Sequence, residues 1–179
     1  ELIKKVFKPK KVLDVGCGPG ALMYLLKEQD VLCHGDDFSP SCKKLAPPKV
    51  RDKIFIGSIV DFETKSNSYD LVICREVLEH LTLAQIKKAV QNLCRISSKY
   101  VYLTTRFHKN PRSLLSVGED KETDPSHITV LNKDFLRALF VMEGFRRRAD
   151  LEDKMDWLKK NRVLVYEKDG QIIAEVNLD

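Results

Sequence analysis

Five short apolar segments, separated by stretches with helical periodicity, constrain the fold more than any other feature of this chain. They are residues 11–15, 31–35, 53–57, 69–74 and 99–105. Each segment is apolar on both faces, which is typical of strands that are covered on both sides of a sheet. Their alternation with helices predicts an α/β fold, a doubly wound and mostly parallel sheet with helices on both faces.

The segments that follow the strands predict the helices. Residues 20–29 have leucines at helical spacing. A short helix is expected to begin at Ser39–Pro40, because serine is a good N-cap and proline fits the first helical position. We expect a long helix over about 77–96 and another over 132–143 that is capped by Asn132.

The last third of the chain has a different pattern. Residues 106–130 are polar and rich in breaks, which predicts a long irregular segment with a functional role. Strands are predicted at 145–151 and 162–168. The Asp169–Gly170 pair predicts a hairpin turn before a last strand near 171–176. We therefore expect an antiparallel strand near the C-terminus.

Length and composition predict a single domain over residues 1–179. No run of about 18 apolar residues is present, so no membrane span is expected. None of the five cysteines forms a C-x-x-C pair, which favours reduced thiols and a cytoplasmic location over a disulfide framework or zinc site. Because residue 1 is Glu rather than Met, we expect a truncated N-terminus.

The charge pattern bears on partners. The net charge is +5, a mild excess that permits an anionic partner without requiring one. The basic residues are not interleaved with aromatic residues as they are in single-strand nucleic-acid binders. A nucleic-acid partner is therefore left open but not favoured, and the oligomeric state is not indicated.

The most informative segment is the glycine-rich run from Val12 to Gly20, VLDVGCGPG. Gly16 and Gly18 lack a β-carbon, so the backbone there can turn tightly and approach a ligand closely. Asp14 is an acid in an apolar strand, a costly placement that a bound ammonium or sulfonium group would offset. The run with Asp37 also fits a loose dinucleotide fingerprint, so a nicotinamide-dependent oxidoreductase remains an alternative.

Four segments in order resemble the motifs of class I S-adenosylmethionine-dependent methyltransferases, of the type 11/23-like group. DVGCGPG at 14–20 resembles the first motif, GDDFSP at 35–40 the second-strand motif, and IGSI at 56–59 the turn after the third strand. YDLVICREVLEHL at 69–81 resembles the fourth-strand motif. The resemblance implies a Rossmann-like fold, S-adenosylmethionine as cofactor, and methyl transfer to an unidentified acceptor, most often a small molecule.

The resemblance also implies a cofactor site. It assigns the glycine loop, with Asp14, Gly16, Cys17 and Gly18, to the cofactor, and Asp37 to the ribose hydroxyls. Phe38 is expected either to lie against the adenine or to pack in the core. Asp36 stands where the family has an apolar residue, so it is either exposed or, with the register shifted by one, the ribose ligand itself.

The remaining cofactor residues follow the third and fourth strands. Ser58 departs from the family pattern, because many members have an Asp at this position that binds the exocyclic amine of adenine. The backbone N–H of Ile59 is still expected to reach the ring nitrogen. Backbone carbonyls at Cys74 and Arg75 are expected to hold the methionine ammonium. No base pattern surrounds the Cys74 thiol, so a packing role is expected for it.

Two alternatives concern the acceptor side. The E-x-x-E-H spacing would place Glu76, Glu79 and His80 on one helical face. That spacing resembles the metal motif of RNA ribose 2'-O-methyltransferases, with His127 as a fourth ligand; no metal is the favoured reading.

His127, in the D-P-S-H segment, is the candidate catalytic base for a hydroxyl acceptor, with a loop-ordering hydrogen bond as the competing role. A non-catalytic cofactor-binding adaptor is the other alternative.

Overall fold

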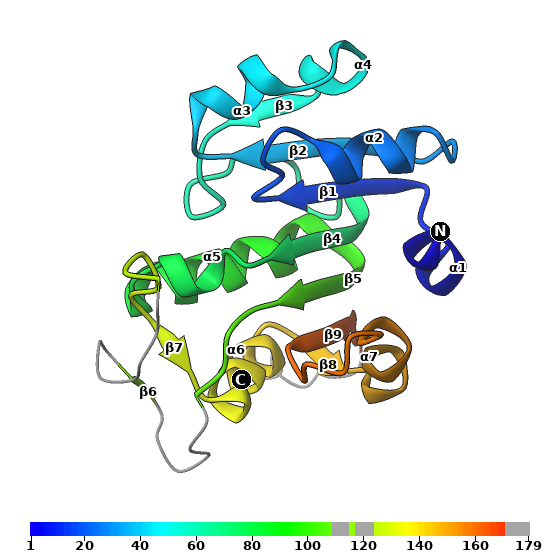
Figure 1. Ribbon diagram of the computed structural model, residues 1–179. Coiled ribbons are helices and arrows are strands. Elements are labelled where there is room, and N and C mark those ends of the chain that lie inside the picture. Colours follow the sequence, from blue (N-terminus) through cyan, green and yellow to red (C-terminus); the bar gives the residue numbers. More distant parts are fainter. Residues whose placement is uncertain (109–114, 117–123, 171–179) are drawn as a thin grey trace.

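A computed structural model describes residues 1–108, 115–116 and 124–170. A seven-stranded sheet with the order β3-β2-β1-β4-β5-β9-β8 runs through the molecule (Figure 1). Its strands are β1 (Lys11–Val15), β2 (Leu32–Asp37), β3 (Ile54–Ile56), β4 (Tyr69–Arg75), β5 (Ser97–Thr104), β8 (Phe145–Arg147) and β9 (Val163–Lys168). All five strands predicted in the first part of the chain are present.

The strands β1 to β5 are parallel, and β9 lies antiparallel between β5 and β8. The predicted α/β class and the antiparallel strand near the C-terminus are thereby confirmed. β1 pairs with β2 on one side and with β4 on the other. The strand order therefore reverses at β1, and the carboxyl ends of strands at such a switch point open a crevice for ligands.

Helices cover both faces of the sheet (Figure 1). Along a strand, successive side chains point to opposite faces, so Val12 belongs to one hydrophobic cluster and Leu13 to the other. The helices are α1 (Leu2–Phe7), α2 (Ala21–Lys27), α3 (Pro40–Leu45), α4 (Pro48–Arg51), α5 (Leu83–Ile96), α6 (Lys133–Met142) and α7 (Ala149–Met155). α1, α2 and α7 contribute to the first cluster, α5 and α6 to the second.

The prediction of one continuous helix over 77–96 was wrong. A 3-10 helix, η1 (Leu78–His80), is followed by a break, and α5 then begins after Thr82. Thr82 and Gln85 form a capping box, in which each side chain accepts from the other residue's backbone N–H, and such a box starts a helix. Glu76 lies before η1 with a positive φ of 52°. Glu76, Glu79 and His80 therefore do not share one helical face.

The C-terminal third also differs from the prediction. The strand expected over 145–151 ends at Arg147, and α7 follows it. Acidic residues in the first turn of α7 favour a helix there, and Glu152 of that helix binds Arg147. Trp157, just after α7, is 73 % exposed. The strand predicted near 171–176 lies outside the described residues.

Two further findings complete the fold. α6 is capped by Asn132, as predicted, through a hydrogen bond from the Asp134 backbone N–H to the Asn132 side chain. The segment predicted to be irregular holds two short antiparallel strands, β6 (Leu115–Ser116) and β7 (Val130–Leu131). In the described part of the chain, no helix combines the length and apolar character needed to cross a bilayer.

Candidate functional site

A cavity of about 700 Å³ lies at the carboxyl ends of β1, β2 and β4. Its walls come from the loop after β1, the end of β2, the turn after β3, and the segment between β4 and α5. Gln85 of α5 and Ser126 close it on the other side. The cavity therefore occupies the switch-point crevice in which doubly wound sheets bind their ligands.

The glycine loop forms one wall because its backbone takes a conformation that side chains resist. Gly16, Gly18 and Gly20 all have positive φ, between 52° and 79°. A β-carbon at Gly16 would lie 2.4 Å from Cγ2 of Val77. The backbone N–H groups of Gly16 and Cys17 donate to the carbonyl of Asp36, at 2.7 and 3.1 Å. The loop is thus held close to the end of β2 and leaves its open side to the cavity.

Asp37 ends β2 and lines the cavity. Its Oδ2 accepts from the Gly18 backbone N–H at 2.9 Å, and its Oδ1 accepts from the Ser39 backbone N–H at 2.9 Å. These bonds fix the carboxylate between the glycine loop and α3. A carboxylate oxygen has two lone pairs, so each oxygen can still accept from a ligand hydroxyl.

Asp36 is buried, so the expectation that it is exposed was wrong. The residue is 1 % exposed, lines the cavity, and has an Oδ1 without a hydrogen-bond partner among the described residues. Burial, and then the neighbouring Asp37, raise the pKa of its carboxyl to about 7. Sequence reasoning left the role of this residue open, although an acid in the place of an apolar residue was a usable signal.

Phe38 is 81 % exposed at the cavity, which excludes core packing for its ring. Ile59 is buried at 2 % and also lines the cavity. Ser58 turns its hydroxyl back to the local chain, where Oγ accepts from the Val60 backbone N–H at 3.3 Å. Two apolar groups and an inward-turned serine therefore surround this end of the cavity.

Five predicted cofactor residues are not among the residues that line the cavity: Asp14, Cys17, Gly18, Cys74 and Arg75. Asp14 is 3 % exposed, and burial raises the pKa of its carboxyl to about 7 while Arg75 opposes the shift. Cys74 is fully buried, and burial raises the pKa of its thiol far above the ordinary range. A protonated, buried thiol is no nucleophile, in line with the packing role expected for it.

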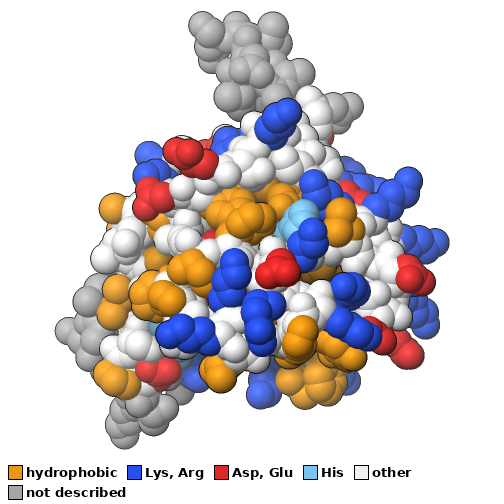
Figure 2. Space-filling model, turned by 90° about the horizontal axis from the view of Figure 1, so that it is seen from above, with side chains coloured by type: hydrophobic (Ala, Val, Ile, Leu, Met, Phe, Trp, Pro, Cys, Tyr) orange, Lys and Arg blue, Asp and Glu red, His pale blue; other side chains and the backbone are white. Residues whose placement is uncertain are grey.

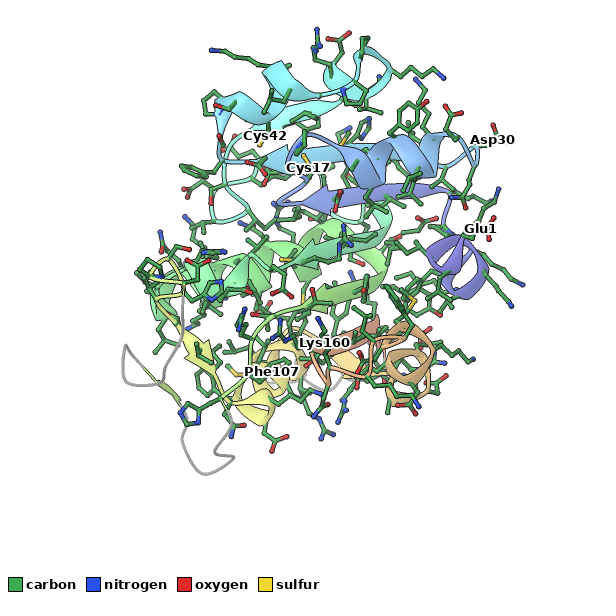
Figure 3. All side chains as sticks on the ribbon, in the orientation of Figure 1. Glu1, Cys17, Asp30, Cys42, Phe107 and Lys160 are labelled. Carbon is green, nitrogen blue, oxygen red and sulfur yellow. The ribbon has the colours of Figure 1, made fainter. Side chains whose placement is uncertain are left out.

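All five cysteines are free thiols. Cys17 and Cys42, both labelled in Figure 3, belong to the loop after β1 and to α3. Burial raises the pKa of the Cys17 thiol well above its usual range.

The other end of the cavity is polar. Glu76, His80, Gln85 and Ser126 line it. Nδ1 of His80 lies 3.1 Å from the carbonyl oxygen of Ser126. Because a carbonyl only accepts, Nδ1 donates to it, so the tautomer of a neutral ring that fits this contact has its lone pair on Nε2. His80, Gln85 and Ser126 had no place in the predicted cofactor or catalytic set, because the fold alone brings residues 85 and 126 together.

His127 lies behind His80. Its side chain is 7 % exposed, its Nε2 is 3.6 Å from Oδ2 of Asp124, and its ring centroid is 4.9 Å from that of His80. Glu79 is fully buried, and its Oε2 accepts from Thr105 Oγ1 at 2.9 Å. Within the described ranges, no three or more His, Cys, Asp or Glu side chains are arranged to hold a metal ion.

The surface beyond the cavity shows no single basic area on the face seen from above. In Figure 2, lysine and arginine side chains are spread among hydrophobic and acidic ones over that face. Acidic partners accompany several of them, as in the pair between Lys49 and Glu28.

Known proteins resemble the chain in sequence. The family described as "Methyltransferase domain" matches residues 1–149. An uncharacterized protein from Methanocaldococcus jannaschii is 26% identical over 148 residues, which are 81% of this chain and 60% of that protein. The small RNA 2'-O-methyltransferase of Mus musculus is 31% identical over 91 residues, 41% of this chain and 23% of the relative. The chain thus spans less than two thirds of these relatives.

Solved structures resemble it in fold. A SAM-dependent methyltransferase from Archaeoglobus fulgidus has a TM-score of 0.71 at 15% identity, over 93% of this chain and 89% of that one. Magnesium protoporphyrin IX methyltransferase from Synechocystis with bound SAM has a TM-score of 0.64 at 18% identity, over 88% and 69%. The chain belongs to the methyltransferase domain family and has the fold of class I S-adenosylmethionine-dependent methyltransferases.

Proposed function

We propose that this chain uses S-adenosylmethionine, bound in the cavity at the switch point of the sheet, to methylate a small-molecule acceptor. The observation that carries the proposal is the cavity itself. It combines a close-packed glycine loop, the fixed carboxylate of Asp37 and the exposed ring of Phe38 in one crevice. The glycine loop would let the backbone come close to the cofactor. The Asp37 carboxylate would accept from the ribose hydroxyls, and the Phe38 ring would lie against the flat adenine ring.

The residues present fit such a cofactor. Gly16 lets the loop pack directly against Val77 in the cavity wall, because a β-carbon there would collide with that side chain, and the Asp36 carboxyl is buried with no partner for Oδ1 among the described residues. The bound cofactor would supply an activated methyl group on a sulfonium. The protein then has to align the acceptor with that methyl and keep water out.

The polar end of the cavity suits the acceptor. A neutral His80 ring has its lone pair on Nε2, because its Nδ1–H donates to the Ser126 carbonyl. A neutral imidazole of this kind takes up a proton from a hydroxyl acceptor at neutral pH. His127, the residue favoured from the sequence, would act on such an acceptor through its contact with His80. We therefore place the acceptor between His80 and Gln85.

Calorimetry with S-adenosylhomocysteine and with NAD tests the cofactor assignment. We expect micromolar binding of S-adenosylhomocysteine to the wild type, at least about tenfold weaker binding to Asp37→Ala because ribose hydrogen bonds are lost, and no binding of NAD. Asp52→Ala removes an exposed aspartate outside the cavity and serves as the matched control. Binding of NAD, or of neither ligand, would contradict the proposal.

Metal-dependent RNA ribose methylation is the alternative, prompted by the mouse relative and by the contact of His80 with His127. It predicts that Mn²⁺ binds the wild type and that His80→Ala and His127→Ala each weaken this binding. It also predicts that a chelator abolishes methylation of small RNA. If Mn²⁺ does not bind and S-adenosylhomocysteine still does, the small-molecule proposal stands. An adaptor role would appear as cofactor binding without turnover on any acceptor.

A further inference from the structure

We propose that Asp36 recognises the exocyclic amine of the cofactor's adenine, and that this carboxyl, not Ser58, makes the chain prefer adenine over an oxopurine. The inference rests on the proposed function, because it assigns one residue of the same cavity to one part of the cofactor.

Asp36 is a carboxyl group in need of a hydrogen-bond donor. It is 1 % exposed, and its Oδ1 has no partner among the described residues. Burial of a polar group without a hydrogen-bond partner destabilises the folded protein. Asp36 lines the cavity, and the terminal torsion of an aspartate is broad, so the carboxyl can turn an oxygen toward a ligand. A donor on a bound ligand would remove this cost.

Neighbouring acceptors already have partners. Both oxygens of Asp37 accept backbone N–H groups, from Gly18 and Ser39. The Ser58 hydroxyl accepts from the backbone of Val60. The carbonyl of Asp36 accepts from the glycine loop. Among these acceptors of the described residues, Oδ1 of Asp36 is the one that has no hydrogen-bond partner at all.

The position of Asp36 selects the part of the ligand. Asp36 pairs with Phe55 of β3, so it lies on the side of the sheet away from β4 and the polar acceptor end. Phe38 and Ile59 line the cavity next to it, which suits a flat ring. Gly57 lies beside the carboxyl and adds no side chain against it, whereas a β-carbon there would be in van der Waals contact with Oδ1, at 3.5 Å. The donor on the edge of an adenine ring is its exocyclic amine.

Electrostatics agrees with this assignment. Burial raises the pKa of the Asp36 carboxyl to about 7, and the neighbouring Asp37 adds to the shift. An amine that donates to the ionised carboxyl would stabilise the charged form, whereas the carbonyl oxygen of an oxopurine would repel it. Discrimination between an amine and a carbonyl is therefore expected from this one side chain.

A comparison of two ligands on four proteins tests the proposal. S-adenosylhomocysteine and S-inosylhomocysteine differ only at the C6–N1 edge of the purine, where an amine and an acceptor nitrogen are replaced by a carbonyl and an N–H. Both are titrated at pH 8 into the wild type, Asp36→Asn, Asp36→Leu and Ser58→Ala. We expect the wild type to prefer the adenosyl ligand by at least about 30-fold, because a buried acceptor left unpaired costs a few kcal/mol. Asp36→Leu should reduce that preference to within about threefold, and Ser58→Ala should keep it. Asp36→Asn, which keeps an oxygen acceptor, should lie between.

The outcomes separate the two proposals. Circular dichroism and thermal midpoints first establish that each variant is folded. If Asp36→Leu weakens both ligands equally, or if Ser58→Ala is the variant that loses the preference, the assignment of Asp36 is overturned while cofactor binding stands. If neither ligand binds the folded wild type, the cofactor assignment itself fails.

Discussion

The pKa values of carboxyl groups are shifted in opposite directions around the two halves of the sheet. In the half that forms the cavity, burial raises the pKa of Asp14, Asp36 and Glu79, each to about 7. In the C-terminal half, a hydrogen bond from Arg148 lowers the pKa of Asp150. The C-terminal half pairs this acid with an arginine, whereas the cavity half holds buried acids, of which Asp36 lines the cavity and has an Oδ1 with no partner among the described residues. Perturbed carboxyls of the second kind cluster at functional sites.

The largest effect should come from Gly16→Ala. A β-carbon there meets the Val77 side chain at 2.4 Å in a backbone with a φ of 69°. Either the loop or the segment after β4 must move, and both line the cavity. We expect binding of S-adenosylhomocysteine to weaken by at least about 100-fold, with an unfolding free energy lower by about 1–3 kcal/mol. Calorimetry and urea denaturation measure the two effects.

Gly18→Ala is the matched control for the contact between a new β-carbon and Val77 in Gly16→Ala. Gly18 also has a positive φ, of 52°, but nothing lies within 4 Å of a β-carbon built there. Only the backbone strain remains, so stability should fall by about 1 kcal/mol and binding should weaken far less than in Gly16→Ala. Equal losses in the two variants would show that loop strain, not contact with Val77, governs the cavity.

Next in size is Glu152→Ala in the C-terminal half. Glu152 is 5 % exposed, accepts from Arg147 at 2.6 to 3.0 Å, and also accepts from the Val165 backbone N–H. Removal of one partner of a buried pair leaves the other unpaired, so the unfolding free energy should fall by about 3 kcal/mol. Cofactor affinity should stay within about twofold of the wild type. Asp150→Ala, an exposed partner of Arg148, should cost far less in the same urea titration.

Asp14→Asn tests the raised pKa values of the cavity half through the pH dependence of stability. Burial raises the pKa of the Asp14 carboxyl to about 7 in the folded protein, against its ordinary value of 3.8 in the unfolded chain, so the unfolded chain loses its proton first as pH rises. This group therefore lowers stability as pH increases from about 4 to about 7. The Asn variant lacks that loss, and between pH 5 and pH 7.5 its stability should fall by about 1–3 kcal/mol less than the wild type's. Parallel pH profiles of the two proteins would contradict the shift.

The smallest effect is expected for Phe38→Ala. The ring is 81 % exposed in the ligand-free protein, so its removal should leave the thermal midpoint unchanged. Contact with an adenine ring would be lost, which should weaken binding of S-adenosylhomocysteine by about threefold to tenfold. Leu45→Ala on α3, at an exposed position outside the cavity, is the control in the same titration. Unchanged affinity in Phe38→Ala would place the ring outside the contact.

Local patterns predicted much of the fold, and the failures have physical causes. The strands were predictable because each is a run of apolar residues that ends at a turn. The helix over 77–96 was wrongly extended, because apolar spacing continues through the capping box of Thr82 and Gln85. α1 was not predicted, although Leu2, Ile3, Val6 and Phe7 lie at helical spacing and Phe7 packs against Tyr100 and Tyr102.

The cavity was predictable only where its residues belong to one contiguous motif. Gly16, Asp37 and Ser58 stand within contiguous motifs and were placed from them. His80, Gln85 and Ser126 meet only because η1, α5 and the segment before β7 converge in space. Short local signals identify the cofactor side, whereas contacts between distant segments build the acceptor side.

The exposed position of Trp157 has a spectroscopic consequence. It is the only tryptophan of the chain, it is 73 % exposed, and it is not among the residues that line the cavity. Intrinsic fluorescence should therefore change little on unfolding and stay silent when cofactor binds. A Trp157→Phe, Phe38→Trp double variant would move the only indole to the mouth of the cavity, where stacking on adenine should quench its emission.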